Sequence, residues 1–290
     1  QLCGISVSGS TIRRVCDRMG MQAAAWLMES VEGAEAFRSA EGQAEFYTDG
    51  VKINTREGGR EMRIHVFAKR PVGTPVPVEK WDERVLPETT ARLAFGSVSA
   101  SEWLGRQWAT LASRLGGPAG RGLSVLADGA KWIWNQADEH LPDAECGVDV
   151  YHVSEHLHGC GRVLHGDQTP EARAWADQQR RDLMQQGPIV YLKQLAAGIQ
   201  VEPRGDRQKP LQALRDYLTP NVDRLGYQSR LARGLPIGSG LVEGACKTLA
   251  GRRLKLNNAR WRPERADHML ALCSLLYGNQ WKNFWAGKAA

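Results

Sequence analysis

The order of strand-like and helix-like segments constrains the fold of this chain more than any other feature. Segments with the alternation or apolar content of strands are confined to residues 45–151. Strands are expected at residues 45–48, 61–69, 92–98, 123–127 and 146–151, and helices at 99–115 and 130–139. Because three strands precede an alternation of helices and strands, this order predicts an α/β fold, a mixed sheet with flanking helices.

The second half has helical periodicity without a strand-like interruption from Thr169 to Arg233. A glycine-rich turn at 234–240 separates this stretch from another expected helix at 240–253. We therefore expect four parts along the chain. They are a helical N-terminal part (1–40), the first part of an α/β core (41–165), an all-helical insertion (166–235), and the C-terminal helices of the core (236–290).

The N-terminal part predicts two helices within residues 9–37, the first of them ended by Gly20. Residues 10–15 (STIRRV) resemble the recognition part of a helix-turn-helix. A short amphipathic helix beside a glycine also occurs in many proteins that bind no DNA. Further along, Ser99 and Glu102 have the spacing of a capping box, which predicts the start of the helix at 99–115.

The basic residues are unevenly distributed. The whole chain has 38 Lys plus Arg against 32 Asp plus Glu, a mild excess of +6. Residues 247–265, in contrast, are rich in Lys and Arg and contain a single acid, Glu264. Such a segment suits a polyphosphate partner, because each neutralised phosphate releases counterions. A solvated helix face explains the charge equally well.

Length and composition exclude several classes of protein. With 290 residues the chain suffices for one large domain or two modest ones. No apolar run approaches the roughly 18–20 residues that span a bilayer, and the first residues lack the pattern of a secretory signal. The six cysteines include no C-x-x-C pair, which favours reduced thiols in a cytoplasmic protein. Because the chain does not begin with Met, we expect it to be part of a longer protein.

Two Asp-Gly pairs follow apolar strand-like segments. Asp49 comes after EFYT, and Asp128 comes after LSVLA. An Asp-Gly pair usually marks a turn. Carboxylates at the ends of neighbouring strands, however, can converge at the rim of a sheet, where they repel each other unless a cation lies between them. Mg²⁺ prefers such oxygen ligands, and a pair of metal ions held in this way can activate an attacking water or hydroxyl.

Spacing alone does not identify a third carboxylate. Glu243 is distinctive because it lies in the first turn of an expected helix, directly after the glycine-rich turn. The helix dipole also favours a glutamate there, without any catalytic role. The candidates that follow Asp128 are Glu139, Asp143, Glu145, Asp149, Glu155, Glu202 and Glu243.

Three segments resemble the acidic blocks of bacterial DDE transposases of the Kra-type insertion-sequence family, which is distantly Mutator-like. They are residues 47–51 (YTDGV), 127–135 (ADGAKWIWN) and 236–243 (PIGSGLVE). The tail is similar to that family's C-terminal signature, with RLK at 253–255, RW at 260–261, ML at 269–270 and WKNFW at 281–285. The resemblance covers residues 44–285 in order. Residues 61–66 (EMRIHV) depart from the Trp-Arg-Glu-Lys type of run that the resemblance predicts for this strand.

The resemblance implies a ribonuclease-H-like fold interrupted by an all-helical insertion. It also implies that Asp49, Asp128 and Glu243 are the catalytic residues and hold two Mg²⁺ (or Mn²⁺) ions. One metal would activate water for strand cleavage, and later the freed 3′-hydroxyl for attack on target DNA.

The partners implied are the terminal inverted repeats of a transposon and target DNA, handled in the bacterial cytoplasm at the nucleoid. A homodimer or higher oligomer is expected, because paired ends must be handled together. Two alternatives are a ribonuclease-H-like nuclease that does not join strands and an inactive, transposase-derived DNA-binding protein.

The pair Asp149 and His152 resembles the Cys/Asp-x-x-His motif of Mutator-like transposases, which is thought to support the active site or the positioning of DNA. The alternative is that Asp149 simply caps the following helix. For DNA binding we expect contacts from a set of residues after the third acid, with Trp261 partly exposed beside DNA. This set is Lys247, Arg252, Arg253, Lys255, Arg260 and Trp261.

Two further possibilities concern the helical half. Trp175 or Tyr191 could stack on an unpaired base, although such residues more often lie in a core. A zinc site is an alternative for the His- and Cys-rich segment, but no second pair of ligands has regular spacing. The residues concerned are Cys146, His152, His156, His158, Cys160 and His165.

Overall fold

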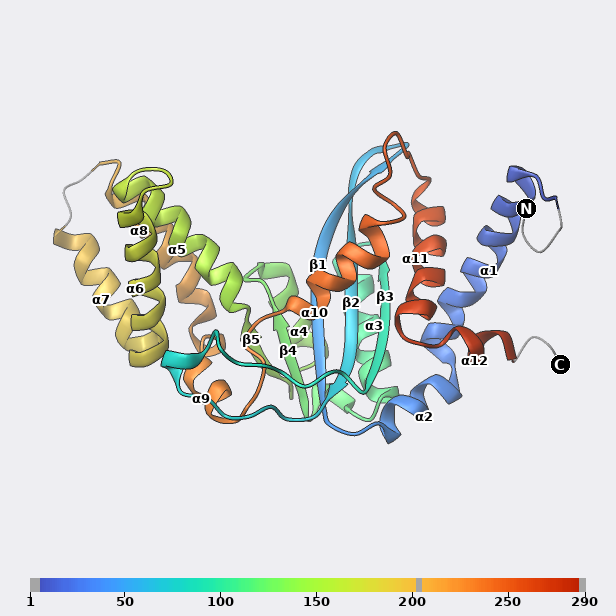
Figure 1. Cartoon of the computed structure of the whole chain (residues 1–290), viewed down its shortest axis with the longest axis horizontal. Helices are drawn as coiled ribbons and strands as arrows, with labels where there is room; N and C mark the ends of the chain where they lie inside the picture. The colour runs from blue at the N-terminus through green and yellow to red at the C-terminus, as the bar shows by residue number, and fades with distance from the viewer. Residues whose placement is uncertain (1–5, 202–204, 287–290) are drawn as a thin grey trace.

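The computed structural model describes residues 6–201 and 205–286, and it has the predicted α/β class. Five strands form one open mixed sheet in the order β3-β2-β1-β4-β5 (Figure 1). β1 pairs antiparallel with β2, and β2 pairs antiparallel with β3, whereas β1–β4 and β4–β5 are parallel. The strands are β1 (Gln43–Thr55), β2 (Gly58–Arg70), β3 (Ala91–Ser97), β4 (Leu123–Ala127) and β5 (Glu145–Val148).

The strand β1 is longer than the sequence predicted. Its parallel pairing with β4 ends at Thr48 opposite Ala127, but its antiparallel pairing with β2 continues to Thr55. The expectation that the strand ends before Asp49 was therefore wrong. Asp49-Gly50 forms no turn, because β2 supplies backbone partners on both sides of it: Asp49 lies opposite Ile64 and Gly50 opposite Arg63.

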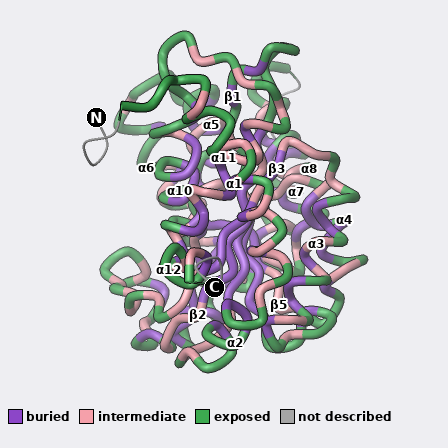
Figure 2. Tube along the Cα trace, turned by 90° about the vertical axis from the view of Figure 1, so that its right-hand side faces the viewer, coloured by how far each residue is buried: buried purple, intermediate pink, exposed green. Residues whose placement is uncertain are grey.

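Helices cover both faces of the sheet. Successive side chains of a strand point to opposite faces, so Phe46 and Tyr47 enter different cores. Phe46 packs with Trp108 of α3 (Ser101–Arg114) and with residues of α4 (Lys131–His140). Tyr47 belongs to the core formed with α10 (Gly240–Ala245), the following π-helix η4 (Cys246–Gly251) and α11 (Pro263–Tyr277). The strands form the buried centre in Figure 2.

The segment between β5 and α10 forms a lobe of helices at one end of the molecule (Figure 1). The described part of residues 166–235 contains no strand, as predicted. α5 begins directly after β5 and runs from the sheet into this lobe. The elements are α5 (Val150–His165), α6 (Pro170–Gln186), α7 (Pro188–Val201), α8 (Gln208–Leu218), η3 (Thr219–Arg224) and α9 (Tyr227–Ala232).

The N-terminal part consists of α1 (Gly9–Glu29) and α2 (Val31–Ser39), separated by Ser30. Gly20 does not end a helix, contrary to the prediction. It is buried in the middle of α1, where a Cβ would lie 2.4 Å from the backbone oxygen of His268. Gly20 is needed because α1 packs closely along α11.

The predicted capping box was also wrong. The N-cap of α3 is Ala100, which makes no side-chain capping bond, and the Ser99 N–H instead donates to Ser97 Oγ. The remaining short elements are η1 (Val78–Lys80), η2 (Pro118–Gly120) and α12 (Trp281–Ala286). Across residues 6–201 and 205–286, no helix combines the length and apolar character needed to cross a bilayer.

Replacing Gly20 tests the contact between α1 and α11. Gly20→Ala should lower the free energy of unfolding by about 1–3 kcal/mol, because the added methyl overpacks against His268. Gly198→Ala is the matched control in α7, where an added Cβ meets nothing within 4 Å. It should stabilise the chain by about 0.5–1 kcal/mol through helix propensity. Urea unfolding measures both free energies. An equal gain in the free energy of unfolding from the two substitutions would contradict the close packing of α1 on α11.

Candidate active site

Asp49 and Asp128 lie side by side at the end of the parallel pairing of β1 with β4. The last paired residues are Thr48 and Ala127, so Asp49 is the next residue of β1 and Asp128 is the first residue after β4. Asp128 Oδ1 accepts the N–H of Ala130 at 2.7 Å, and Asp49 Oδ1 accepts the N–H of Gly50 at 2.7 Å. The register of the sheet thus brings the first two predicted acids together.

The electrostatics of Asp49 reflect this pairing. Burial raises the pKa of its carboxyl, and the negative charge of Asp128 acts in the same direction. The N–H of Gly50 and the nearby imidazole of His152 partly offset this rise in pKa. The negative charge of ionised Asp49 is therefore only partly balanced by neighbouring groups, and a bound cation would balance it further.

Glu243 lies on α10, near Asp49 but directed elsewhere. Its Oε1 forms an ion pair at 2.6 Å with Lys247 Nζ, one turn further along. Cys246, three residues after Glu243, places its Sγ 3.7 Å from Asp49 Oδ2. Burial raises the pKa of the Cys246 thiol, and the charges of Asp49 and Glu243 add to that rise. Cys246 therefore lies within electrostatic range of both acids.

The three predicted acids do not form a ready metal cage. Within the described part of the chain, no group of three or more His, Cys, Asp or Glu side chains is arranged to hold a metal ion. Asp49 and Asp128 fit a hard divalent cation as adjacent oxygen ligands. Glu243 can add a third only by leaving Lys247. That exchange costs little, because both side chains of the pair are largely exposed, 63% and 74%.

Asp149 is buried at the junction of β5 and α5 and has a structural task. Its Oδ1 caps α5 by accepting the N–H of Tyr151 at 2.6 Å. Its Oδ2 accepts the N–H of Ser239 at 2.7 Å and also the Ser239 hydroxyl. Gly238 fits beneath Tyr151, where a Cβ would lie 2.6 Å from the ring. Asp149 therefore caps a helix and also ties the turn before α10 to the sheet.

His152 and His156 occupy successive turns of α5 on the side of the acids. His152 influences the pKa of Asp49 and lies 3.5 Å from Glu155 through its Nδ1. His156 stacks on Tyr217 of α8, with ring centroids 3.6 Å apart. Burial lowers the pKa of His156, whereas Asp128 acts to raise it.

Tyr217 is a residue that sequence analysis missed. It packs against Gly129, where a Cβ would lie 2.4 Å from its ring, so only glycine allows this approach. In the Asp128-Gly129 pair only the carboxylate was interpreted, as a candidate metal ligand, and no local pattern indicated a contact at Gly129. Through Tyr217 the helical lobe reaches the loop that carries Asp128.

The other possibilities in the helical half gain no support. Cys160 lies in the core, where burial raises the pKa of its thiol to about 12. Tyr191 is buried inside the lobe and donates its hydroxyl proton to Gln179 Oε1 at 3.0 Å, so it cannot stack on a base. Trp175 is half-buried against the same core.

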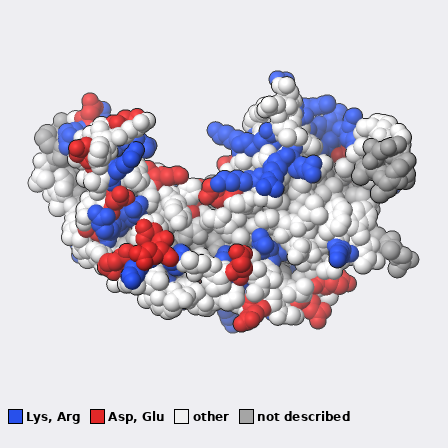
Figure 3. All heavy atoms as spheres, in the orientation of Figure 1, with Lys and Arg blue, Asp and Glu red and all other residues white. Residues whose placement is uncertain are grey.

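The predicted DNA-binding cations lie on the surface. Figure 3 shows Lys and Arg on one side of a hollow, in the region of α10 and the β1–β2 tip, and Asp and Glu on its floor. Trp261 is half-buried, and its Nε1 donates to Leu254 O at 3.1 Å. The exposed cations are Lys247, Arg252, Arg253, Lys255 and Arg260.

Comparison with known proteins does not assign the chain to a group. No protein-family model matches it, and no curated protein matches it. A proposal for the function therefore rests on the three acids and the residues around them.

The raised pKa of Asp49 predicts a pH-dependent stability difference. The pKa is higher in the folded chain, so ionised Asp49 disfavours folding above the unfolded pKa of about 3.9, and the cost disappears as the pH falls below it. In metal-free buffer at pH 7, Asp49→Asn should raise the Tm, because the substitution removes the disfavoured charge. At pH 3.5 the difference should be much smaller.

Asp206→Asn is the control, since the Asp206 side chain is 95% exposed. Thermal scans at the two pH values should show no comparable rise for this variant. A Tm of Asp49→Asn equal to or below that of the wild type at pH 7 would contradict the electrostatic account.

Proposed function

We propose that the chain is a DDE transposase, an enzyme that cuts DNA at transposon ends and joins the cut strand to target DNA. The adjacency of Asp49 and Asp128 at the end of paired parallel strands carries this proposal. The sheet order, three antiparallel strands followed by two parallel ones, is compatible with a ribonuclease-H-like fold. The helical lobe before α10 matches the insertion that the resemblance implies.

Each acid has a distinct part in the proposed site. Asp49 and Asp128 are held by the sheet, and Glu243 joins them from α10 after leaving Lys247. Two Mg²⁺ or Mn²⁺ ions held by these carboxylates would supply activation of the attacking oxygen and stabilisation of the leaving oxygen. Asp149 is a positioning residue, because its bonds to Ser239 determine where α10 begins.

The surface charges suit the proposed substrate. The exposed cations after Glu243 border the acidic floor of the hollow, where they can neutralise DNA phosphates next to the acids (Figure 3). Terminal inverted repeats and target DNA are the proposed partners, and a homodimer or higher oligomer would hold the two ends together. The proposed location is the bacterial cytoplasm.

The ion pair of Glu243 with Lys247 favours a second candidate, an inactive DNA-binding protein derived from a transposase. In that protein the pair would persist, and binding of DNA would be independent of Mg²⁺. A nuclease that cuts without joining is distinguished by its products.

Substituting the acids separates these functions. With Mg²⁺ or Mn²⁺ and duplexes carrying the end sequences of the element, Asp49→Asn, Asp128→Asn and Glu243→Gln should each lower cleavage at least about 100-fold, because each removes stabilisation of several kcal/mol. DNA affinity should change by less than about threefold, since the phosphate-binding cations remain. Labelled strands on sequencing gels report cleavage and joining.

Glu171→Gln, an exposed substitution at the start of α6, is the control and should retain full activity. Full strand transfer by Glu243→Gln would contradict the assignment of the third acid. Cleavage without joining by the wild type would indicate a nuclease, and binding without cleavage would indicate the inactive protein.

A further inference from the structure

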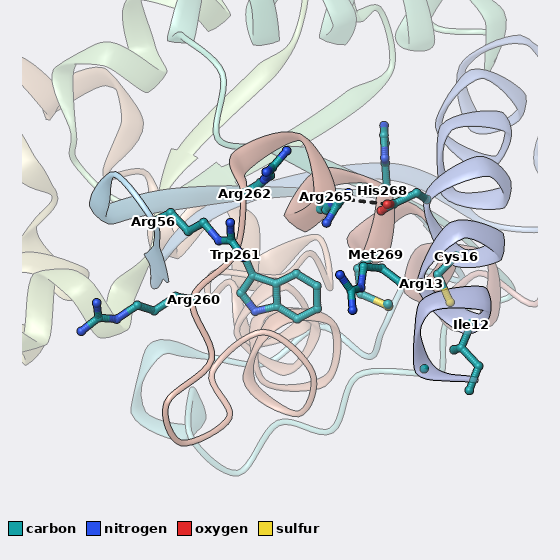
Figure 4. A pocket seen from close by; sticks show the side chains of 12 residues that line it. Ile12, Arg13, Cys16, Arg56, Arg260, Trp261, Arg262, Arg265, His268 and Met269 are labelled. Atoms are coloured by element: carbon teal, nitrogen blue, oxygen red, sulfur yellow. Dashed lines mark ion pairs between the residues drawn. The ribbon is translucent and has the colours of Figure 1, made fainter. Parts of the chain in front are cut away.

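A second concave site lies where α1, the tip of the β1–β2 hairpin and the start of α11 meet (Figure 4). It is a cavity of about 430 Å³. None of the three proposed catalytic acids lines it. Its most distinctive lining residues are five arginines from separate parts of the chain: Arg13, Arg56, Arg260, Arg262 and Arg265.

The positive charge of this arginine pocket is poorly compensated. Asp17 is the one acid among the lining residues, and it forms an ion pair with Arg265 at 3.0 Å. The other four arginines make no ion pair with any described residue. Like charges gathered in this way favour an anion, and the guanidinium fork matches the oxygens of a phosphate.

The backbone holds the arginines of the hairpin and the tail in place. The Trp261 N–H donates to Asn54 O at 3.0 Å, and the Arg56 N–H donates to Trp261 O at 2.8 Å. This parallel bridge extends β1 and fixes the residues on both sides of Trp261. The indole N–H bonds to Leu254 O, so Trp261 supports the pocket floor and is not free to stack on a base.

The arginine pocket lies at the far end of β1 from Asp49, because Arg56 is the first residue after the strand. Arg56 follows Asp49 by seven residues, and an extended strand rises about 3.3 Å per residue, which separates the two by roughly 20–23 Å. B-form DNA rises about 3.4 Å per base pair. A duplex lying along β1 with one phosphate at the acids would therefore reach the pocket after about six or seven base pairs.

We propose that the arginine pocket binds backbone phosphates of duplex DNA, about six or seven base pairs from the phosphate that lies at the acids. The binding of duplex DNA is inferred from the charges of the pocket alone. The register, meaning the distance of about six or seven base pairs from the acids, rests on the proposed function. The pocket recognises phosphate and not base sequence, so it holds the DNA flank in place during chemistry at the acids.

The salt dependence of binding to a fluorescein-labelled 40-base-pair duplex tests the pocket itself. The slope of log Kd against log salt should fall by about 2.7 in the full-chain variant R56A/R260A/R262A, since each lost phosphate contact removes about 0.9. At 100 mM salt the Kd should rise at least tenfold. The variant R38A/R106A/R121A removes the same charge from α2, from α3 and from the segment after η2.

The control variant should keep the wild-type slope. Equal losses in the two triple variants, or no loss in R56A/R260A/R262A, would overturn the proposal. Circular dichroism verifies that each variant is folded. If the slope falls as expected but no cleavage occurs under any condition, the phosphate-binding role of the pocket is supported and the proposed transposase activity is rejected.

Single methylphosphonate substitutions in the duplex on which cleavage is measured test the register. A neutral phosphate about six or seven base pairs from the cut should weaken wild-type binding about three- to tenfold, and it should have no further effect on R56A/R260A/R262A. Sensitive positions confined to the two base pairs next to the cut would overturn the register.

Discussion

β1 pairs with two neighbours over different lengths, and the candidate site depends on that difference. The parallel ladder with β4 stops at Thr48 and Ala127, which leaves two aspartates adjacent where the ladder opens. The antiparallel ladder with β2 continues, and it keeps Asp49 rigid instead of in a flexible turn. The same continuation places Arg56 at the far tip, directly after β1, so this strand links Asp49 to the arginine pocket.

Two contacts bring distant segments of the chain to this strand. Asp149 binds Ser239 across the molecule and thereby orients α10, on which Glu243 lies. Tyr217 contacts Gly129 from the helical lobe, so the lobe and the loop of Asp128 are packed together. A movement of the lobe would therefore act directly on the loop that carries Asp128. The ion pair of Glu243 with Lys247 leaves the third acid outside this packed arrangement.

Much of the fold could be predicted from the sequence, because burial imposes local patterns. The alternation in β2 and the short apolar run of β4 indicated both strands and the sheet class. The position of Asp49-Gly50 inside β1 could not be predicted, since a local turn signal does not show that a partner strand continues past it. Gly20 was misinterpreted for a similar reason: its contact, His268, is far away in the sequence.

The site was predictable to a different degree for each residue. Asp49 and Asp128 each follow an apolar strand-like segment that the sequence displays, although β1 continues past Asp49. The spacing of Glu243 and Lys247 also allowed a helical ion pair, but spacing does not show whether the pair forms. Tyr217 depends on how α8 packs, for which the sequence has no local signal.

The central claim is that Asp49, Asp128 and Glu243 together hold divalent metal ions. Anomalous diffraction from crystals of the chain containing Mn²⁺ tests this most directly. The account predicts an anomalous peak between the carboxylates of Asp49 and Asp128, with Glu243 turned away from Lys247 and towards the metal. Crystals saturated with Mn²⁺ that show no peak between Asp49 and Asp128 would contradict it.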